Sequence, residues 1–437
     1  MPTLPTNAAA ANSPLAPVNY GRTLALLASL FFMWGFITVI NNTLLPHLRA
    51  VFELNYTQTT LIESVWFIAY FVASIPSAKL IERIGYKRSI VIGLCIMAGG
   101  ALLMIPAARI PSYGVVLSAL FVVASGITLL QVAANPYVAV IGTPESAPAR
   151  LNLVQAFNSM GTTFAPLFGG YLILGRSTSG TAQSNATFTY AQRMADAQAV
   201  QLPYFIVAVA LVVLAVVIAR YKLPDLGAST RRVAAAARKQ HSLWRHRNLV
   251  FGAPAIFIYL IAEIGVSNLF INFVSAPEIG NLTHESASHY LFLLWGGMMV
   301  GRFVGSYLMR SFSAEGVLAA ASIGAFIVMT ITMLTHGPVA MWALISVGLF
   351  HSIMFPTIFT LGIRGLGPLT EEGSGILIMA IAGGALVVVQ GTLADWFGLQ
   401  RSFALTSACE IYVLFYALWG SKPTHALADE QLTVSAK

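Results

Sequence analysis

Long apolar runs recur along the 437-residue chain and are separated by short polar segments. Each run is close to the roughly 20 residues that an α-helix needs to cross the hydrocarbon core of a bilayer. This length argues against a barrel of alternating strands, whose membrane segments are about 10 residues long. The pattern predicts twelve membrane-spanning helices, at residues 23–46, 58–81, 88–108, 113–141, 150–174, 201–221, 249–274, 287–309, 314–335, 338–362, 373–395 and 402–420.

The predicted spans fall into two sets of six. The longest charged segment, residues 223–247, separates residues 23–222 from residues 248–420. Two bundles around a central path, with a site near the middle of the membrane, are typical of secondary transporters. We therefore expect an all-α membrane protein with two six-helix bundles, joined by a basic cytoplasmic linker and flanked by tails at 1–22 and 421–437.

Composition supports the membrane class. Hydrophobic residues make up 57% of the chain and charged residues 9%, with a mean hydropathy of +0.76, whereas soluble domains carry about 25% charged residues. With both termini on the cytoplasmic side, 19 of the 24 Lys and Arg residues lie in cytoplasmic segments, as the positive-inside rule requires. The net charge of +8 thus follows from topology. The basic linker is interpreted as lying near anionic lipid rather than as a site for nucleic acid.

The sequence lacks the motifs that would indicate a disulfide framework, a metal site, nucleotide binding or a hydrolase. Both cysteines, Cys95 and Cys409, lie within apolar spans, so neither a disulfide framework nor a zinc site is indicated. The sequence has no phosphate-binding GK[ST] loop and no HExxH or GxSxG motif. We expect no enzyme activity, no catalytic residues, no metal and no cofactor.

Amide side chains interrupt the fourth and fifth spans. Gln131 and Asn135 are four residues apart and therefore share one helical face. A second polar face contains Asn152, Gln155, Asn158 or Ser159, and Thr162, at spacings of three and four residues. Such groups are tolerated in a membrane only against protein or a watery cavity. The two faces predict a polar path, and amides suit a neutral polyol because they both donate and accept hydrogen bonds.

Two segments, at the ends of the second and eighth spans, carry a related basic motif. One reads AKLIERIGYKRSIVIG and includes Arg83 and Lys87, and the looser second one reads GRFVGSYLMRSFSAEG and includes Arg302. The first resembles the cytoplasmic signature of the major facilitator superfamily. We expect Arg83, Lys87 and Arg302 to take part in gating by joining the two bundles in one state. Anchoring of the topology is the alternative.

Five further segments make the resemblance specific: FFMWGFITVINNTLLPHL, LLQVAANPYVAVIG, RLNLVQAFNSMGTT, HSIMFPTIFTLGIRGLG and GSGILIMAIAGGALVVVQG. They resemble the fucose permease family of sugar:proton symporters, and in particular its glucose/galactose permease branch. The resemblance implies that Gln131 stands where fucose permease has a glutamate that handles sugar. It also implies that Asn158 binds sugar and that Gln155 faces the same cavity.

The chain departs from this family in its first span. The family's proton-carrying aspartate lies there, but this sequence reads Asn41-Asn42-Thr43. Asn42 can hydrogen-bond a hydroxyl but cannot take up or release a proton, so Asn41 and Asn42 remain candidates for sugar binding. Three explanations stay open for the missing acid: the coupling site has moved, coupling is lost, or the asparagine is an engineered substitution.

Other acids within the spans are candidates for coupling. Glu263 lies near the middle of the seventh span, followed by Asn268. A charged side chain there costs about 2.5–3.5 kcal/mol on insertion scales, so a functional role in sugar binding or proton coupling is the default. Glu63, early in the second span, is a further coupling candidate. We interpret His351 as a core histidine with satisfied hydrogen bonds, with a partner for a sugar hydroxyl or a proton site as the alternatives, and Glu410 as a structural or peripheral residue.

These observations predict a monomeric, multi-pass transporter of the cytoplasmic membrane that moves a hexose of the glucose/galactose type by alternating access. H⁺ is the expected coupling ion, with Na⁺ as an alternative. Rival cargoes are an amino sugar, another sugar, or a hydrophobic drug exchanged by antiport. A non-transporting membrane sensor is the more distant rival.

Overall fold

The computed structural model describes residues 20–52, 56–109, 113–169, 201–223 and 242–424. Within these ranges only the backbone is described for residues 40–52, 56–63, 108–109, 166–169, 284–285 and 288. The predicted tails at 1–22 and 421–437 and the predicted linker at 223–247 lie largely outside the described residues. Their boundaries stay predictions.

The described part of the N-terminal half is helical. Its elements are α1 (Gly21–Phe52), α2 (Tyr56–Ile84), α3 (Tyr86–Arg109), α4 (Tyr113–Val140), the 3₁₀ turn η1 (Pro144–Ser146), α5 (Ala147–Gly169) and α7 (Gln201–Arg220). A left-handed glycine, Gly85 with φ of 84°, makes the sharp turn from α2 to α3, because glycine has no Cβ to oppose that backbone conformation.

The C-terminal half contains more numerous and shorter elements. They are η3 (Leu243–Arg245), α9 (Arg247–Ser275), α10 (His284–Leu308), α11 (Ala314–Leu334), α12 (Gly337–His351), α13 (Met354–Ile363), η4 (Gly367–Leu369), α14 (Thr370–Met379), η5 (Ala380–Leu386), α15 (Val387–Phe397), α16 (Leu399–Ser402), α17 (Ala404–Phe415) and the π-helical η6 (Tyr416–Gly420).

Eleven helical segments of the described residues are long and apolar enough to cross a membrane. They correspond to eleven of the twelve predicted spans, and α5, described as far as Gly169, covers most of the remaining one. Helices suit this environment because each one satisfies its backbone hydrogen bonds internally. The prediction of an all-α membrane protein is therefore confirmed, with eleven to twelve spans.

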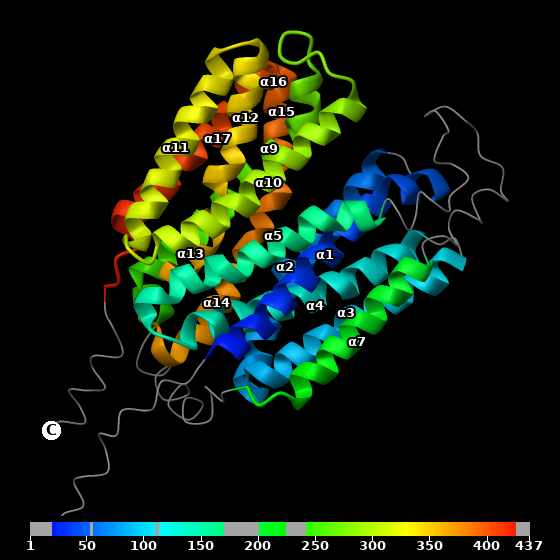
Figure 1. The fold of residues 1–437 in the computed structure, drawn as a ribbon, viewed down its shortest axis with the longest axis vertical. Coiled ribbons are helices and arrows are strands. Elements are labelled where there is room, and N and C mark those ends of the chain that lie inside the picture. The colour runs from blue at the N-terminus through cyan, green and yellow to red at the C-terminus, as the bar shows by residue number, and fades with distance from the viewer. Residues whose placement is uncertain (1–19, 53–55, 110–112, 170–200, 224–241, 425–437) are drawn as a thin grey trace, which may run out of the picture.

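The helices form two bundles that meet along a limited interface. Figure 1 shows α1–α7 on one side and α9–α17 on the other. Contacts between the two sides are made chiefly by α5 with α10 and by α2 with α14. In the same view, the start of α1 and the end of η6 lie at the same end of the bundles. Further contacts between the two sides join α13 to α5, α14 to α4 and η5 to α2. Of these elements, α5 carries the polar face described above.

The tenth, eleventh and twelfth predicted spans are not continuous α-helices, the twelfth because α17 is followed by the π-helical η6. The tenth span, expected as one helix at 338–362, consists of α12 and α13 with a break at Ser352 and Ile353. Pro356 explains the break, because it has no N–H to donate to the carbonyl four residues earlier, that of Ser352. The eleventh span, expected at 373–395, changes from α14 to a 3₁₀ segment and then to α15. There a Cβ on Gly383 would collide with the carbonyl of Phe257 on α9.

The same kind of close approach joins α1 to α5. A Cβ on Gly161 would collide with the carbonyl of Phe32, and one on Gly35 would collide with the carbonyl of Asn158. Small residues let helix backbones approach closely in membranes, where packing rather than the hydrophobic effect drives association. These glycines therefore fix α5 against α1 and set the position of its polar face.

Candidate functional site

Gln131 lies in the interior of the N-terminal bundle. Its side chain is 3% exposed, and its Nε2 lies 2.5 Å from the hydroxyl oxygen of Tyr70 on α2. The amide oxygen Oε1 is buried without a hydrogen-bond partner among the described residues. Exchanging the O and N assignments of the amide would leave the NH₂ group unpaired instead. In either orientation Gln131 retains unused hydrogen-bonding capacity.

Asn135 lies one turn along the same face of α4. Its Oδ1 accepts a hydrogen bond from Nε2 of Gln155 on α5, at 3.4 Å, and its Nδ2 is buried with no partner in the described part of the chain. Both Asn135 and Gln155 are buried. The predicted polar faces of α4 and α5 therefore meet in the structure. Together Gln131 and Asn135 provide unpaired donor and acceptor groups, at positions where burial of an unsatisfied polar atom is costly.

Asn158 connects two helices of the same bundle. Its Nδ2 donates to the carbonyl of Phe31 on α1 at 2.9 Å, and the residue is 9% exposed. One of its amide hydrogens is thus already used in joining α5 to α1. The sugar-binding role that the resemblance implies for Asn158 stays a prediction.

The predicted eighth span, 287–309, contains Arg302, and the structure places this residue within the membrane-spanning part of α10, which continues to Leu308. Its guanidinium reaches across to α5 in the other bundle, where it donates to the hydroxyl of Ser159 and, at 3.3 Å, to the carbonyl of Gln155. Its Nε donates to the carbonyl of Ser352 at 2.9 Å. The arginine therefore joins α5 to the break between α12 and α13.

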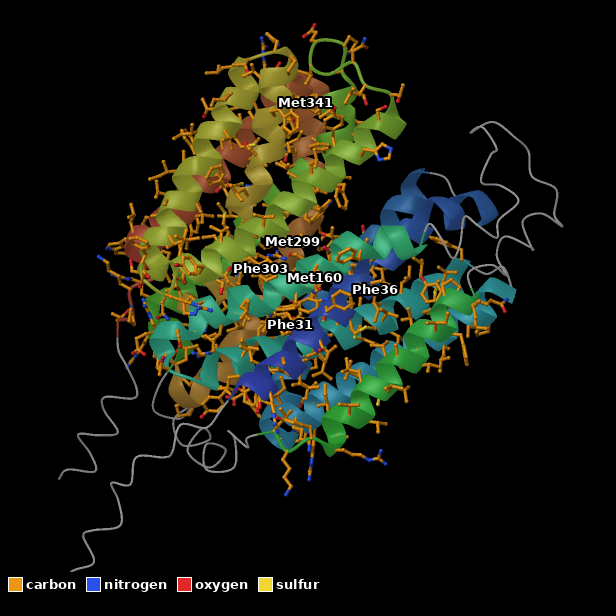
Figure 2. The ribbon with its side chains drawn as sticks, in the orientation of Figure 1. Phe31, Phe36, Met160, Met299, Phe303 and Met341 are labelled. Carbon is orange, nitrogen blue, oxygen red and sulfur yellow. The ribbon has the colours of Figure 1, made fainter. Side chains whose placement is uncertain are left out.

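Further hydrogen bonds between the bundles lie at the same end of α5. Nδ2 of Asn152 donates to the hydroxyl of Thr357 on α13 at 3.1 Å. The hydroxyl of Ser306 on α10 donates to the carbonyl of Ala149 at 2.8 Å. Apolar contacts accompany them: Figure 2 shows Met160, Met299 and Phe303 gathered where α5 and α10 meet. These bonds connect the bundles at the end where α5 begins and α10 ends.

A cavity of about 810 Å³ lies beyond this interface. The α4–α5 loop, the α10–α11 loop and the end of α13 line it, and Glu145, Arg310, Glu315 and Arg364 contribute charged side chains. Arg364 and Glu315 form an ion pair at 2.6 Å. Charged groups from both bundles therefore surround one cavity at this end.

Glu263 and Asn268 lie on α9, in the C-terminal bundle. Glu263 is partly exposed, and its charge interacts with Arg302 and with Tyr259, one helical turn earlier. Asn268 is exposed. The structure thus brings Glu263 near the arginine that contacts α5, whereas Gln131 and Asn135 lie in the other bundle.

Several predicted residues cannot be placed in this way. The side chains of Asn41, Asn42 and Glu63 lie outside the described residues, although their backbones belong to α1 and α2. Arg83 is exposed and Lys87 partly exposed beside the turn at Gly85. Two roles therefore stay predictions: gating by Arg83 and Lys87, and proton coupling by Glu63 or by the residue at position 42.

The structure also contains a polar pair whose pairing the sequence did not suggest. Nε2 of His351, at the end of α12, lies 2.8 Å from Oε1 of Glu410 on α17, and the two side chains are 2% and 0% exposed. Each residue was visible as an ionisable group in an apolar span, which was the available signal. Their pairing across 59 positions depends on helix packing.

Comparison with known proteins agrees with this architecture. The sequence matches the Major Facilitator Superfamily over residues 26–389. It is 47% identical over 420 residues to a glucose/galactose transporter of Brucella abortus biovar 1 (strain 9-941), covering 96% of this chain and 99% of the relative. It is 33% identical over 413 residues to the L-fucose-proton symporter of Escherichia coli (strain K12), covering 92% of this chain and 94% of the relative.

A solved structure shows the same arrangement of helices. The crystal structure of the major facilitator transporter FucP in the outward conformation superposes with a TM-score of 0.84 at 32% identity, covering 92% of this chain and 99% of that one. These matched proteins are transporters rather than enzymes. With a family match over most of its length and relatives aligned nearly end to end, this chain belongs to the Major Facilitator Superfamily.

Proposed function

We propose that this protein transports a monosaccharide, a hexose of the glucose/galactose type, across the cytoplasmic membrane by alternating access. Its similarity to the glucose/galactose transporter, at 47% identity over nearly the whole chain, supports the class of cargo. The single structural observation that carries the proposal is the incompletely paired amide face of Gln131 and Asn135 on α4.

A neutral sugar suits these amides chemically. With respect to the residues that the structure describes, Gln131 and Asn135 leave one acceptor and one donor unused in a buried position, and each sugar hydroxyl both donates and accepts. A bound hydroxyl would remove the penalty of an unsatisfied buried group, which is about 1–3 kcal/mol. A hydrophobic drug would leave that penalty in place, so the amides favour a polyol over the drug-antiport alternative.

The hydrogen bonds between the two bundles indicate which side of the transporter is closed. The hydrogen bonds of Arg302, Asn152 and Ser306 join the bundles at one end. We place that end, the linker and both termini in the cytoplasm, because most of the basic residues lie there. The conformation is then outward-facing, which the superposition with outward FucP supports. Release of sugar inside requires the hydrogen bonds between α5 and α10 to break.

The coupling ion is proposed to be H⁺, with Na⁺ as the alternative. Among the relatives is an L-fucose-proton symporter, and Glu263, Glu63 and position 42 are the candidates that the sequence offers. The functional unit is proposed to be a monomer in contact with membrane lipid. Arg83, Lys87 and Arg302 are the proposed gating residues.

Counterflow in liposomes tests the proposed cargo. Purified protein is reconstituted with unlabelled D-glucose or D-galactose inside, and entry of the labelled sugar is followed with no ion gradient. Transient accumulation above the level in protein-free liposomes is expected, and lower affinity in the Gln131→Ala variant. Absence of exchange with glucose, galactose and other hexoses by a correctly folded protein would overturn the proposal.

A further inference from the structure

A buried ionisable pair lies in the C-terminal bundle and has no part in the sugar path described above. His351 is the last residue of α12, and Glu410 lies in α17, with 2.8 Å between Nε2 and Oε1. Both residues lie inside membrane-spanning segments, far from either end. Ionisable groups at such positions are costly and for that reason are functional candidates.

The pair is not arranged as a fully satisfied structural contact. Oε1 of Glu410 contacts the imidazole, whereas Oε2 is buried without a hydrogen-bond partner among the described residues. Packed apolar side chains often stabilise a protein as much as a buried ion pair does. A carboxyl oxygen left unpaired inside a membrane bundle is therefore poorly explained by stability alone, and it is a place where a proton can reside.

We propose that His351 and Glu410 together form the proton-binding site of this transporter, which takes the place of an acid at position 42. This inference rests on the proposed function as a sugar transporter. The ligand is H⁺ and the site is the imidazole–carboxyl pair rather than either residue alone, because Nε2 of His351 and Oε1 of Glu410 lie within hydrogen-bond distance of each other.

The charge balance explains why proton movement follows conformation. A neutral imidazole beside a carboxylate has a net charge of −1, and one added proton makes the pair neutral. On uptake a hydronium ion gives its proton to the pair and becomes water; one N–H or O–H bond forms and nothing is oxidised or reduced. The neutral form suits the buried state, and release leaves a net charge that requires water. The proton therefore leaves only when the bundle opens.

The surroundings of the pair connect it to the bundle interface. The hydroxyl of Tyr259 on α9 donates to the carbonyl of His351 at 2.9 Å, while Arg302 donates to the carbonyl of Ser352, the next residue. The break that positions His351 is thus also the place where Arg302 is fixed, and Arg302 contacts Ser159 on α5. A shift of this break changes the contact between the bundles.

The charged and titratable groups around the pair come from several helices. Tyr259 and Glu263 belong to α9, and both interact with Arg302 of α10, while Tyr259 and Cys409 also interact with Glu410. Glu263 is partly exposed and one turn from Tyr259, so this face of α9 leads from a partly exposed carboxyl toward the buried pair. The charge of the pair therefore acts on Tyr259, which also interacts electrostatically with Arg302.

The test separates exchange from accumulation in proteoliposomes. Counterflow of labelled hexose needs no net proton movement, whereas accumulation driven by a pH gradient, acidic outside, does. Glu410→Gln keeps the side-chain size and an acceptor for the imidazole but cannot exchange a proton. We expect counterflow within about two-fold of the wild type and a loss of at least ten-fold in gradient-driven accumulation. His351→Asn should behave in the same way.

The matched control is Glu278→Gln, the same change at an exposed carboxyl in the α9–α10 loop, which should leave both activities unchanged. Full accumulation by folded Glu410→Gln and His351→Asn variants would overturn the inference. If the wild-type protein shows counterflow but no accumulation driven by the pH gradient, the inference is also overturned, although sugar transport itself is then confirmed. Failure of wild-type counterflow with every hexose would instead refute the proposed function.

A second measurement does not depend on the variants. Sugar is added to the wild-type protein in weakly buffered detergent, and the pH of the solution is recorded. We expect the number of bound protons to change, because sugar binding shifts the equilibrium between the outward-facing and inward-facing conformations. The protonation of the His351–Glu410 pair changes with that conformation. Sugar binding without any exchange of protons would overturn the inference even if neither variant folds.

Discussion

Removing the arginine between the bundles should shift the protein toward the state in which α5 and α10 separate. Arg302 makes two contacts across the interface, to the hydroxyl of Ser159 and to the carbonyl of Gln155 at 3.3 Å. Its bond to Ser352 lies within one bundle, so it contributes to stability but not to the balance between states. Only the two contacts across the interface enter the expected shift for Arg302→Ala.

The magnitude follows from these contacts. A hydrogen bond to a charged group contributes about 1.5–3 kcal/mol, and the contact with Gln155 is long enough to count for little. We therefore expect a loss of about 2 kcal/mol, which changes the ratio of the two states by roughly 30-fold. Ser159→Ala removes the same hydrogen bond from the other side and should shift the ratio in the same direction by a comparable factor, because the guanidinium loses this acceptor.

Cysteine labelling measures the shift. Ser306 is 3% exposed and its hydroxyl contacts α5, so a Ser306→Cys reporter becomes reactive when the helices separate. Cys95 and Cys409 are replaced in the background. Arg401→Ala, at an exposed position in α16, is the control and should not change the labelling rate. Unchanged rates in both Arg302→Ala and Ser159→Ala would show that Arg302 does not control the interface.

Three further predictions concern binding, coupling and packing. Gln131→Ala or Asn158→Ala should weaken sugar binding at least ten-fold, about 1.4 kcal/mol; unchanged affinities in calorimetry would remove both from the site. Asn42→Asp should increase accumulation driven by a pH gradient while counterflow stays the same, because it adds a second proton-binding acid; proteoliposome uptake decides this, and no increase would contradict it. Gly161→Val should lower the melting temperature measured in detergent, since a Cβ there collides with the carbonyl of Phe32; an unchanged temperature would mean that α1 can move aside.

Much of the architecture could be predicted from the sequence because the bilayer imposes a local rule. A span must be long and apolar and must satisfy its own backbone, so hydropathy alone located the helices. The amides of α4 and α5 were recognisable for the same reason, since Gln131 and Asn158 stand out against an apolar background. Helical periodicity then placed the amides of each span on one face.

The partners of these residues were decided by tertiary structure. Helices that are apolar on nearly all sides give little indication of which face meets which neighbour, so the contact of Arg302 with Ser159 and the pairing of His351 with Glu410 were not readable. The break between α12 and α13 has a local cause in Pro356, which leaves the carbonyl of Ser352 without its helical donor. Which group donates to that carbonyl instead depends on where α10 and its Arg302 lie. Composition and spacing therefore determined the spans and their polar faces, whereas helix packing decided which polar groups are paired and which remain available for a ligand.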